Sequence, residues 1–295
     1  MHEKPKNKKI MILITDSGSS KCTWCFALET DRQIRITTTG INPSTQDREV
    51  ILNIIHQELF PALQKQENIF STSKPEKIFF YGAGCTEARK SFMAEILQAC
   101  FGAKNIEVYS DMLGAARSLF QRSTGIACIL GTGANSCLYD GEKIAAQTPA
   151  LGYILGDEGS GAYLGKMLLR ALFKRKLPAS IRQAFQEEYG LDMATVIERT
   201  YRTPMANRFL ASLTPFLHRH KDEKEIHALL CNAFDDFIFY NLEAYRPQST
   251  QVSFIGSIAF YFQEELKECL QQRGFQLGTV IQDPMDGLLK YYIGK

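Results

Sequence analysis

The feature that most constrains the fold is a strand, turn and strand pattern that occurs twice in the chain. The segments Gly18-Ser-Ser-Lys-Cys22 and Gly133-Ala-Asn-Ser-Cys137 match at a glycine and a cysteine, and each lies between two stretches with the apolar pattern of strands. After each segment the same order of elements restarts. We therefore predict an α/β chain of two lobes that share one plan, β-β-β-α-β-α-β-α, each lobe holding a mixed sheet.

The predicted elements follow this plan in both halves. In the first lobe we expect strands at 10–16, 22–29, 33–38, 77–81 and 106–109. We expect helices at 45–66, 86–99 and 111–121, the first of them capped by Ser44 or Thr45. In the second lobe we expect strands at 125–130, 136–139, 143–146, 252–255 and 276–280. We expect a long helical insert over about 158–245, a helix at 258–273 and a terminal helix near 286–292. The two lobes are predicted to comprise residues 1–115 and 116–295, with a hinge within 115–124. The terminal segment 284–295 could pack back on the first lobe.

The composition argues against nucleic acid and membranes as partners. The 34 basic and 32 acidic residues leave a net charge of +2, which is too small to attract nucleic acid or an anionic membrane. No apolar run reaches the ~18 residues of a membrane helix. The lysine-rich start at 4–9 is expected to be a solvated tail, and the apolar stretch after it stops at Thr15 and Asp16 without a cleavage site for export. We expect a soluble, cytoplasmic protein.

The cysteines and histidines do not form a recognisable metal motif. The 8 cysteines are scattered, which predicts free thiols in a reducing cytoplasm. Cys22 and Cys25 have the spacing of a redox or metal pair, but an offset of three on a strand sends their side chains to opposite faces of the sheet. His218 and His220 could imitate a zinc site with His227. Because no cysteine or carboxylate cluster accompanies them at ligand spacing, a solvated turn between helices is the favoured interpretation.

The turn between the first two strands has the composition of a phosphate-binding bend. Gly18 permits close approach of a ligand to the backbone, and the amides of Ser19, Ser20 and Lys21 can point at an anion. Asp16, at the end of the preceding strand, could orient Mg²⁺ through water. The alternative is an ordinary Asx turn that caps a hairpin, and this segment taken alone favours the alternative.

A second turn has the same character. In LGTGANS, Gly131 and Gly133 flank the hydroxyl of Thr132. Two such turns predict that each lobe offers amides and hydroxyls to a phosphate chain, while closure of the lobes excludes water. The sequence lacks the Gly-Lys-Ser/Thr and helix of a Walker loop. Gly256 and Ser257 stand between a strand and a helix and could place bare backbone against an adenosine, although such a connection is common.

Asp111 is the candidate general base. It closes a short strand and opens a helix in the segment Tyr109-Ser-Asp. Its functional role would be to take the proton from an attacking hydroxyl as the γ-phosphoryl group is transferred in line. Its structural alternative is the cap of that helix, which is a sufficient reason for an aspartate at such a position.

The segment 151–161 is the most informative stretch. Four glycines surround two acids just ahead of a helix, which indicates tight backbone geometry. Asp157 could accept hydrogen bonds from sugar hydroxyls, and Tyr153 offers a flat apolar face to a ring. The rival interpretation is that Asp157 or Glu158 only caps the helix at 162–173.

These motifs resemble a known family. The segments LGTGANSCLYDG and LGYILGDEGSGAYLG, which follow Tyr109-Ser-Asp in this order, resemble the N-acetylglucosamine kinase group, within a wider family of ATPases that includes activators of acyl-CoA dehydratases and reductases. The resemblance spans nearly the whole chain. It implies the duplicated, ribonuclease-H-like fold of actin and hexokinase, with ATP and Mg²⁺ bound in the cleft.

The resemblance also implies roles for individual residues. Asp16 and Ser20 would belong to the first phosphate loop, and Thr132 with Gly133 to the second. Asp111 would be the base. The implied neighbours of adenosine are Gly256 and Ser257, and the implied amino-sugar pocket contains Asn42, Asn135, Gly152, Tyr153 and Asp157.

The sequence departs from the family pattern in three places. The first loop reads Asp-Ser-Gly where two glycines are common, and Tyr153 stands where the mammalian pattern has tryptophan, which leaves the sugar open. The zinc-binding cysteine motif of a related sugar-kinase group is missing, so no structural metal is expected.

Three functions fit these observations to different degrees. The first is transfer of the ATP γ-phosphate to the 6-hydroxyl of N-acetylglucosamine or a near relative, and a homodimer is one option for its assembly. The second is an ATPase that drives electron transfer through an iron–sulfur cluster shared across a dimer, which the scattered cysteines disfavour. The third is a sugar sensor without turnover, which the presence of Asp111 and both turns disfavours.

Overall fold

The protein divides into two compact units. The computed structural model describes residues 10–28, 32–66 and 74–294. Unit 1 comprises Met1–Ser118 and Pro284–Lys295, and unit 2 comprises Leu119–Asp283. The lysine-rich tail expected at 4–9 lies outside the described residues.

Unit 1 is built on a five-stranded sheet with the order β3-β2-β1-β4-β5. Strands β1 (Ile12–Ser17), β2 (Lys21–Ala27) and β3 (Gln33–Thr39) form an antiparallel meander. Strands β4 (Lys77–Gly82) and β5 (Asn105–Ser110) continue the sheet in parallel with β1. The helices of this unit are α1 (Arg48–Ile54), α2 (Phe60–Gln64), α4 (Glu87–Phe101), α5 (Asp111–Phe120) and α15 (Met285–Ile293).

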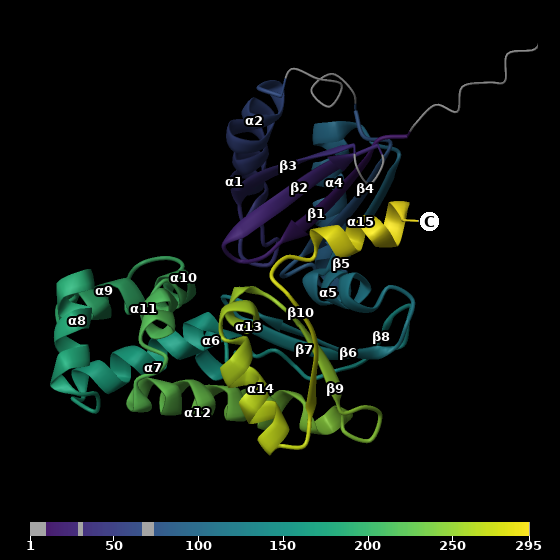
Figure 1. Ribbon diagram of the computed structural model, residues 1–295. Helices are drawn as coiled ribbons and strands as arrows, with labels where there is room; N and C mark the ends of the chain where they lie inside the picture. Colours follow the sequence, from purple (N-terminus) through teal and green to yellow (C-terminus); the bar gives the residue numbers. More distant parts are fainter. Residues whose placement is uncertain (1–9, 29–31, 67–73, 295) are drawn as a thin grey trace, which may run out of the picture. The chain divides into compact units, whose positions relative to one another are not determined.

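Each face of this sheet has its own core. Cys22 of β2 lies in the core formed with α1 and α4, whereas Cys25 lies in the core formed with α15. The prediction that these two side chains lie on opposite faces of the sheet is therefore confirmed. The helix α15 comes from the end of the chain and packs on the sheet of unit 1 (Figure 1), where the ring of Tyr292 stacks on Phe79 with centroids 3.7 Å apart.

Unit 2 repeats this topology. Its sheet has the order β10-β9-β6-β7-β8, with β6 (Gly125–Leu130), β7 (Ala134–Tyr139) and β8 (Ile144–Gln147) antiparallel and with β9 (Gln251–Ile255) and β10 (Gln276–Ile281) parallel to β6. Strand for strand, this is the order and direction found in unit 1. The predicted duplicated α/β fold is confirmed.

The helices of unit 2 form one apolar core with a face of its sheet, to which Cys128 and Phe254 contribute. They are α6 (Gly152–Leu155), α7 (Gly161–Phe173), α8 (Ala179–Tyr189), α9 (Met193–Tyr201), α10 (Ala206–Ala211), α11 (Thr214–Arg219), α12 (Lys224–Asn241), α13 (Ser257–Tyr261) and α14 (Gln263–Gln272). Among the residues that the structure describes, no helix combines the length and apolar composition needed to cross a membrane.

Two predicted helices differ from the observed ones. The helix expected at 45–66 starts at Arg48 and contains a π-helical turn at Ile55–Leu59. Its cap is Asp47, so the assignment of Ser44 or Thr45 was wrong: the Ser44 hydroxyl instead donates to the carbonyl of Gly84 at 2.7 Å. The helix expected at 258–273 is divided into α13 and α14, because Phe262 leaves helical geometry (φ −110°, ψ 32°) while its side chain remains buried.

We predict that Asp47→Ala lowers the free energy of unfolding by about 0.5–2 kcal/mol, the usual value of a helix cap. The reason is that an Asp47 carboxylate oxygen accepts the amide of Val50 at 3.0 Å. Chemical denaturation measures the change. Thr45→Ala serves as the control, because the Thr45 hydroxyl makes only a 3.5 Å contact with the carbonyl of Asn42. An equal loss in both variants would contradict the assignment of the cap.

Candidate active site

In unit 1 the two predicted acidic residues lie at the same edge of the sheet. The parallel register aligns Ser17 of β1 with Gly82 of β4, and Gly82 with Ser110 of β5. Asp16 precedes the first of these residues and Asp111 follows the last. Because neighbouring strands lie ~4.8 Å apart, the two acidic residues flank the end of β4.

The first turn is closed tightly and is supported by the loop after β3. The amide of Gly18 donates to the carbonyl of Lys21 at 3.0 Å. The buried Ser17 hydroxyl accepts the amide of Ile41 at 2.8 Å and donates to its carbonyl at 2.9 Å. Gly40 packs against the turn so closely that a Cβ there would lie 2.3 Å from the Gly18 carbonyl oxygen. Sequence reasoning missed Ser17 and Gly40, although both stand beside motifs that it singled out.

Asn42, a predicted sugar ligand, is held by the same loop. Its amide donates to the side-chain oxygen of Gln46 at 2.8 Å, and its own side-chain oxygen accepts the amide of Ser44 at 3.0 Å. The side chain lies directly over Gly84, where a Cβ would come within 2.0 Å of the Asn42 oxygen. The structure therefore places Asn42 beside the loop between β4 and α4.

Asp111 is not the cap of its helix. The hydroxyl of Ser110 accepts the amide of Leu113 at 3.3 Å, which is the geometry of a cap, while an Asp111 carboxylate oxygen accepts the neighbouring amide of Met112 at 2.9 Å. The capping interpretation of Asp111 was wrong. Burial raises the pKa of the Cys85 thiol to about 12, and the negative charge of Asp111 adds to the shift, so the half-buried carboxylate lies near the loop after β4.

In unit 2 the second turn is fixed by the start of α7. The carbonyls of Gly131 and Thr132 accept the amides of Gly161 and Ala162 at 2.8 and 3.1 Å. Gly256 packs against the same turn with φ +123°, and a Cβ there would lie 2.3 Å from the carbonyl oxygen of Leu130. Glycine is therefore required at position 256 by packing and by its backbone conformation.

Asp157 folds back onto the second turn. Its carboxylate accepts the amide of Ala134 at 3.2 Å, and a Cβ at Gly133 would lie 3.0 Å from its other oxygen. The cap of α7 is Ser160, whose hydroxyl accepts the amide of Tyr163 at 3.2 Å. The interpretation of Asp157 or Glu158 as that cap was wrong.

The environment of Asp157 disfavours its charged form. Burial is the main cause that raises its pKa above the usual value of a carboxyl group, and the charge of Glu158 adds to the effect. The amide of Ala134 and the charge of Lys166 oppose it. In addition, the backbone of Asp157 adopts a left-handed conformation with φ +57°, which is uncommon for a residue other than glycine.

The other predicted residues of unit 2 lie on three different elements. Gly152 and Tyr153 start the short helix α6, which sequence analysis did not identify. The carbonyl of Tyr153 accepts a hydrogen bond from the ammonium group of Lys166 at 3.3 Å. Asn135 lies on β7, where its side-chain oxygen accepts the side-chain amide of Gln147 at 3.0 Å. Ser257 begins α13, is exposed and directly follows Gly256.

Two glycines in the turns have no structural reason to be glycine. A Cβ at Gly131 would meet no atom within 4 Å, and one at Gly18 would meet only the Lys21 carbonyl oxygen at 3.9 Å. Neither residue has a positive φ. The space beside both backbones is open, which fits a ligand that approaches the chain more closely than a side chain would allow.

Comparison of the chain with solved structures shows the family to which it belongs. A candidate N-acetylglucosamine kinase from Porphyromonas gingivalis is 45% identical, with a TM-score of 0.90 over 97% of this chain and 99% of that chain. The chain belongs to the N-acetylglucosamine kinase family. No protein-family model and no curated protein matches it.

Members and more distant structures share the fold over most of their length. A second candidate kinase of the family, from Chromobacterium violaceum, is 20% identical with a TM-score of 0.72 and covers 96% of this chain and 98% of its own. A ROK-family glucokinase from Streptomyces griseus, solved with glucose and AMPPNP, is 11% identical with a TM-score of 0.54 over 95% of this chain and 97% of its own. These two matches show the actin-like and hexokinase-like fold.

We predict that Asp157→Asn raises the free energy of unfolding at neutral pH. A carboxyl group whose pKa is raised in the folded state holds its proton more tightly there than in the unfolded chain, so stability is lost as the pH rises through the window between the two pKa values. The neutral amide avoids this loss, and its oxygen can still accept the amide of Ala134. Urea unfolding at neutral pH measures the difference.

Asp140→Asn is a control of opposite sign. The amides of Lys143 and Glu142 donate to the Asp140 carboxylate at 2.8 and 2.9 Å and lower its pKa. The stability that this charge contributes is present above the unfolded pKa and is lost as the pH falls through the folded pKa. At neutral pH this variant should be less stable than the parent chain. A change of the same sign in both variants would contradict the proposed environment of Asp157.

Proposed function

We propose that this chain transfers the γ-phosphoryl group of ATP to a hydroxyl of N-acetylglucosamine or a closely related amino sugar, giving the 6-phosphate. The observation that carries the proposal is the 45% identity, over 97% of the chain, to a candidate kinase for this sugar. The position of Asp111 and the open glycines of both turns support it independently. The cytoplasmic location and the homodimer stay predictions.

The two turns are proposed to bind the phosphates of ATP. Gly18 and Gly131 leave space beside the backbone, and the proposed contacts around them come from Ser19, Ser20, Lys21, Thr132 and Gly133. Asp16 would hold Mg²⁺ through water, and this ion would neutralise charge on the phosphates. The bare backbone at Gly256, followed by Ser257, would receive the adenosine.

Asp111 is proposed as the general base, which accepts the proton of the sugar hydroxyl. Because Ser110 caps α5, the carboxylate of Asp111 is not needed to complete the helix. Asp111 lies in the first turn of α5, at the positive end of the helix dipole. A carboxylate at the same edge of the sheet as the phosphate-binding turn of unit 1 is suited to proton abstraction.

The sugar is proposed to contact Asn42, Asn135, Gly152, Tyr153 and Asp157. An ionised Asp157 only accepts hydrogen bonds, so it would recognise sugar hydroxyls as donors. Tyr153 would offer an aromatic face to the apolar side of the ring. The short helix α6 carries Gly152 and Tyr153 together, so a change in its position would affect both contacts.

An iron–sulfur ATPase is disfavoured by the state of the thiols. Such clusters are held by thiolates, whereas burial raises the pKa of the described thiols Cys22, Cys85, Cys128 and Cys137. These four side chains are buried within the units and are unsuited to a cluster shared between two subunits.

We predict that Asp111→Asn lowers turnover by about 10²–10⁴-fold, the usual contribution of a general base. Affinity for the nucleotide should stay close to that of the parent chain, because the amide retains the size of the side chain. ADP release is measured against a panel of amino sugars and plain hexoses, and the phosphorylated hydroxyl of the product is identified by NMR.

The same assay separates the alternatives. Asp140→Asn, in an exposed hairpin turn, should retain full turnover. Unchanged turnover in Asp111→Asn would remove this residue from the mechanism. If no sugar releases ADP while an amino sugar still raises the melting temperature, the protein is a sensor; iron and colour in the purified chain would indicate the electron-transfer ATPase.

We predict that Gly131→Ala weakens nucleotide binding at least ~10-fold, equivalent to ~1.4 kcal/mol, while stability stays equal or rises by about 0.4–1 kcal/mol. A Cβ at this position meets no protein atom within 4 Å but fills the open space beside the turn. Titration calorimetry with AMPPNP and urea unfolding give the two values.

Gly256→Ala is the matched contrast. Its Cβ would lie 2.3 Å from the Leu130 carbonyl oxygen, so the free energy of unfolding should fall. Unimpaired nucleotide binding in a stable Gly131→Ala chain would show that the second turn does not contact the phosphates.

A further inference from the structure

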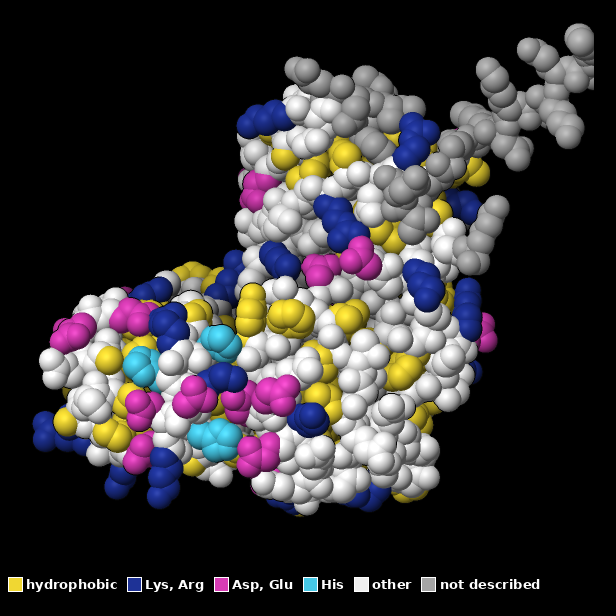
Figure 2. Space-filling view, viewed as in Figure 1, with side chains coloured by type: hydrophobic (Ala, Val, Ile, Leu, Met, Phe, Trp, Pro, Cys, Tyr) yellow, Lys and Arg dark blue, Asp and Glu magenta, His cyan; other side chains and the backbone are white. Residues whose placement is uncertain are grey.

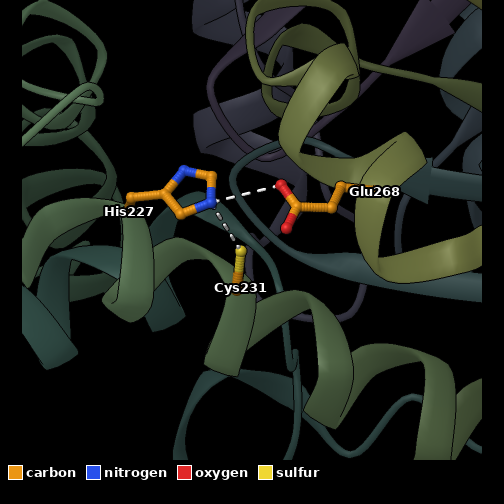
Figure 3. Close-up of side chains that lie close together, drawn as sticks. All are labelled: His227, Cys231 and Glu268. Carbon is orange, nitrogen blue, oxygen red and sulfur yellow. Dashed lines mark hydrogen bonds and ion pairs between the residues drawn. The ribbon is translucent and has the colours of Figure 1, made fainter. Parts of the chain in front are cut away.

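Helices α12 and α14 of unit 2 bring three metal-ligating side chains together, on elements separate from the phosphate-binding turns. His227 and Cys231 are four residues apart on α12 and therefore lie on one face of that helix. Glu268 reaches the same point from α14 (Figure 3). Their ligand atoms all lie within 4.8 Å of one another.

The two distances from the His227 ring are close to those between ligands of one tetrahedral ion. Nε2 of His227 lies 3.2 Å from a carboxylate oxygen of Glu268 and 3.4 Å from Sγ of Cys231. With Zn–N and Zn–O bonds of about 2.0–2.1 Å and a Zn–S bond of about 2.3 Å, tetrahedral angles give separations of about 3.4 and 3.5 Å. Without an ion, a proton on Nε2 can be donated to Glu268 or to Cys231, but a metal ion is bound by all three atoms.

The surroundings favour a cation and leave room for water. His227 and Glu268 line a surface cavity of about 330 Å³ together with Glu264, Glu265 and Lys267. Acidic side chains gather over α14 beside histidine side chains (Figure 2). The side chain of Glu265 is only 6% exposed, and while one of its oxygens pairs with Lys221 at 2.9 Å, the other is buried without a hydrogen-bond partner in the described structure. Glu265 is among the residues that line this cavity, and a buried carboxylate oxygen without a hydrogen-bond partner favours a cation nearby.

We propose that His227, Cys231 and Glu268 bind a divalent transition-metal ion of the zinc class, with water in the fourth position. Nitrogen, sulfur and oxygen ligands in tetrahedral arrangement are typical of zinc. The side chains of His227 and Glu268 are 40% and 47% exposed, so an ion and its water can reach the site from solvent. The ion would tie α12 to α14, two helices that pack beside each other in unit 2.

The neighbouring histidines and thiol do not belong to the site. His218 lies within α11 with its ring 5.6 Å from that of Phe262, so the favoured interpretation of a solvated turn was wrong for this residue. His220 is half-buried in the turn that follows α11, with its ring 4.4 Å from that of Phe216. Cys269 is buried and donates to the carbonyl of Cys231 at 3.7 Å.

The experiment uses the full, untagged chain after treatment with a chelator. Equilibrium dialysis against Zn²⁺ should show one tightly bound ion per chain, and Co²⁺ should give a thiolate-to-metal charge-transfer band that disappears in Cys231→Ser. His227→Ala and Glu268→Gln should each weaken Zn²⁺ binding by more than the ~10–100-fold that loss of an outer-shell contact costs. Zn²⁺ should raise the melting temperature of the parent chain and leave that of Cys231→Ser unchanged.

The matched controls are Cys100→Ser, a half-buried thiol in unit 1, and Glu264→Gln, a carboxylate in the same cavity. Both should bind Zn²⁺ within a few-fold of the parent chain and keep the cobalt band. Absence of stoichiometric Zn²⁺, a cobalt complex without the thiolate band, or equal binding in Cys231→Ser would each overturn the proposal. None of these measurements depends on sugar or nucleotide turnover.

Discussion

The hydrogen bonds from the amides of Gly161 and Ala162 to the carbonyls of Gly131 and Thr132 hold the site of unit 2 together. The first amides of a helix have no partner within the helix, and here the second turn supplies two of the acceptors. As a result, these two carbonyls of the turn are occupied by hydrogen bonds from α7, and a phosphate would bind to the amides of the turn. The start of α7 is thereby used for structure and is not available as an anion-binding helix end.

In both units a glycine packs against the turn, but this glycine follows a different strand in each unit. Gly40, which follows β3, packs against the carbonyl of Gly18, and Gly256, which follows β9, packs against the carbonyl of Leu130. In both cases an added Cβ would lie 2.3 Å from the carbonyl oxygen. Because β3 and β9 do not occupy equivalent places in the two sheets, this support was not simply copied with the duplicated strands. Each turn required its own neighbouring glycine.

The strands could be predicted closely because local pattern determines them. The expected strand at 125–130 coincides with β6, and the other observed strands begin and end within a few residues of their predicted bounds. The helix ends were harder, because Ser44, Thr45 and Asp47 are all suitable caps. The choice is made by a contact distant in sequence, in which the Ser44 hydroxyl is used by the carbonyl of Gly84. The break at Phe262 carries no glycine or proline signal, and the ring at this position is buried.

In the candidate site, too, some residues could be recognised from local sequence motifs, whereas others are brought together only by the fold. Glycine-rich turns and the aspartate after β5 were visible as motifs, but only the fold shows that Ser110 and Ser160 are the caps of α5 and α7. The His227 and Cys231 pair lies at helix spacing and could have been noticed in the sequence. Glu268 lies on a different helix, so its approach to that pair depends on packing between α12 and α14.

Asp157 combines features that structure alone does not require. Burial together with the charge of Glu158 disfavours its ionised form, and its backbone adopts the left-handed conformation. The single hydrogen bond from the Ala134 amide could be accepted equally well by asparagine, which also tolerates this backbone conformation. Within the turn a carboxylate therefore has no advantage over an amide, whereas the proposed sugar ligand would supply one by donating hydrogen bonds to the negative charge. That is the property expected of a group that binds sugar hydroxyls, and it connects the geometry of the segment 151–161 with the proposed substrate.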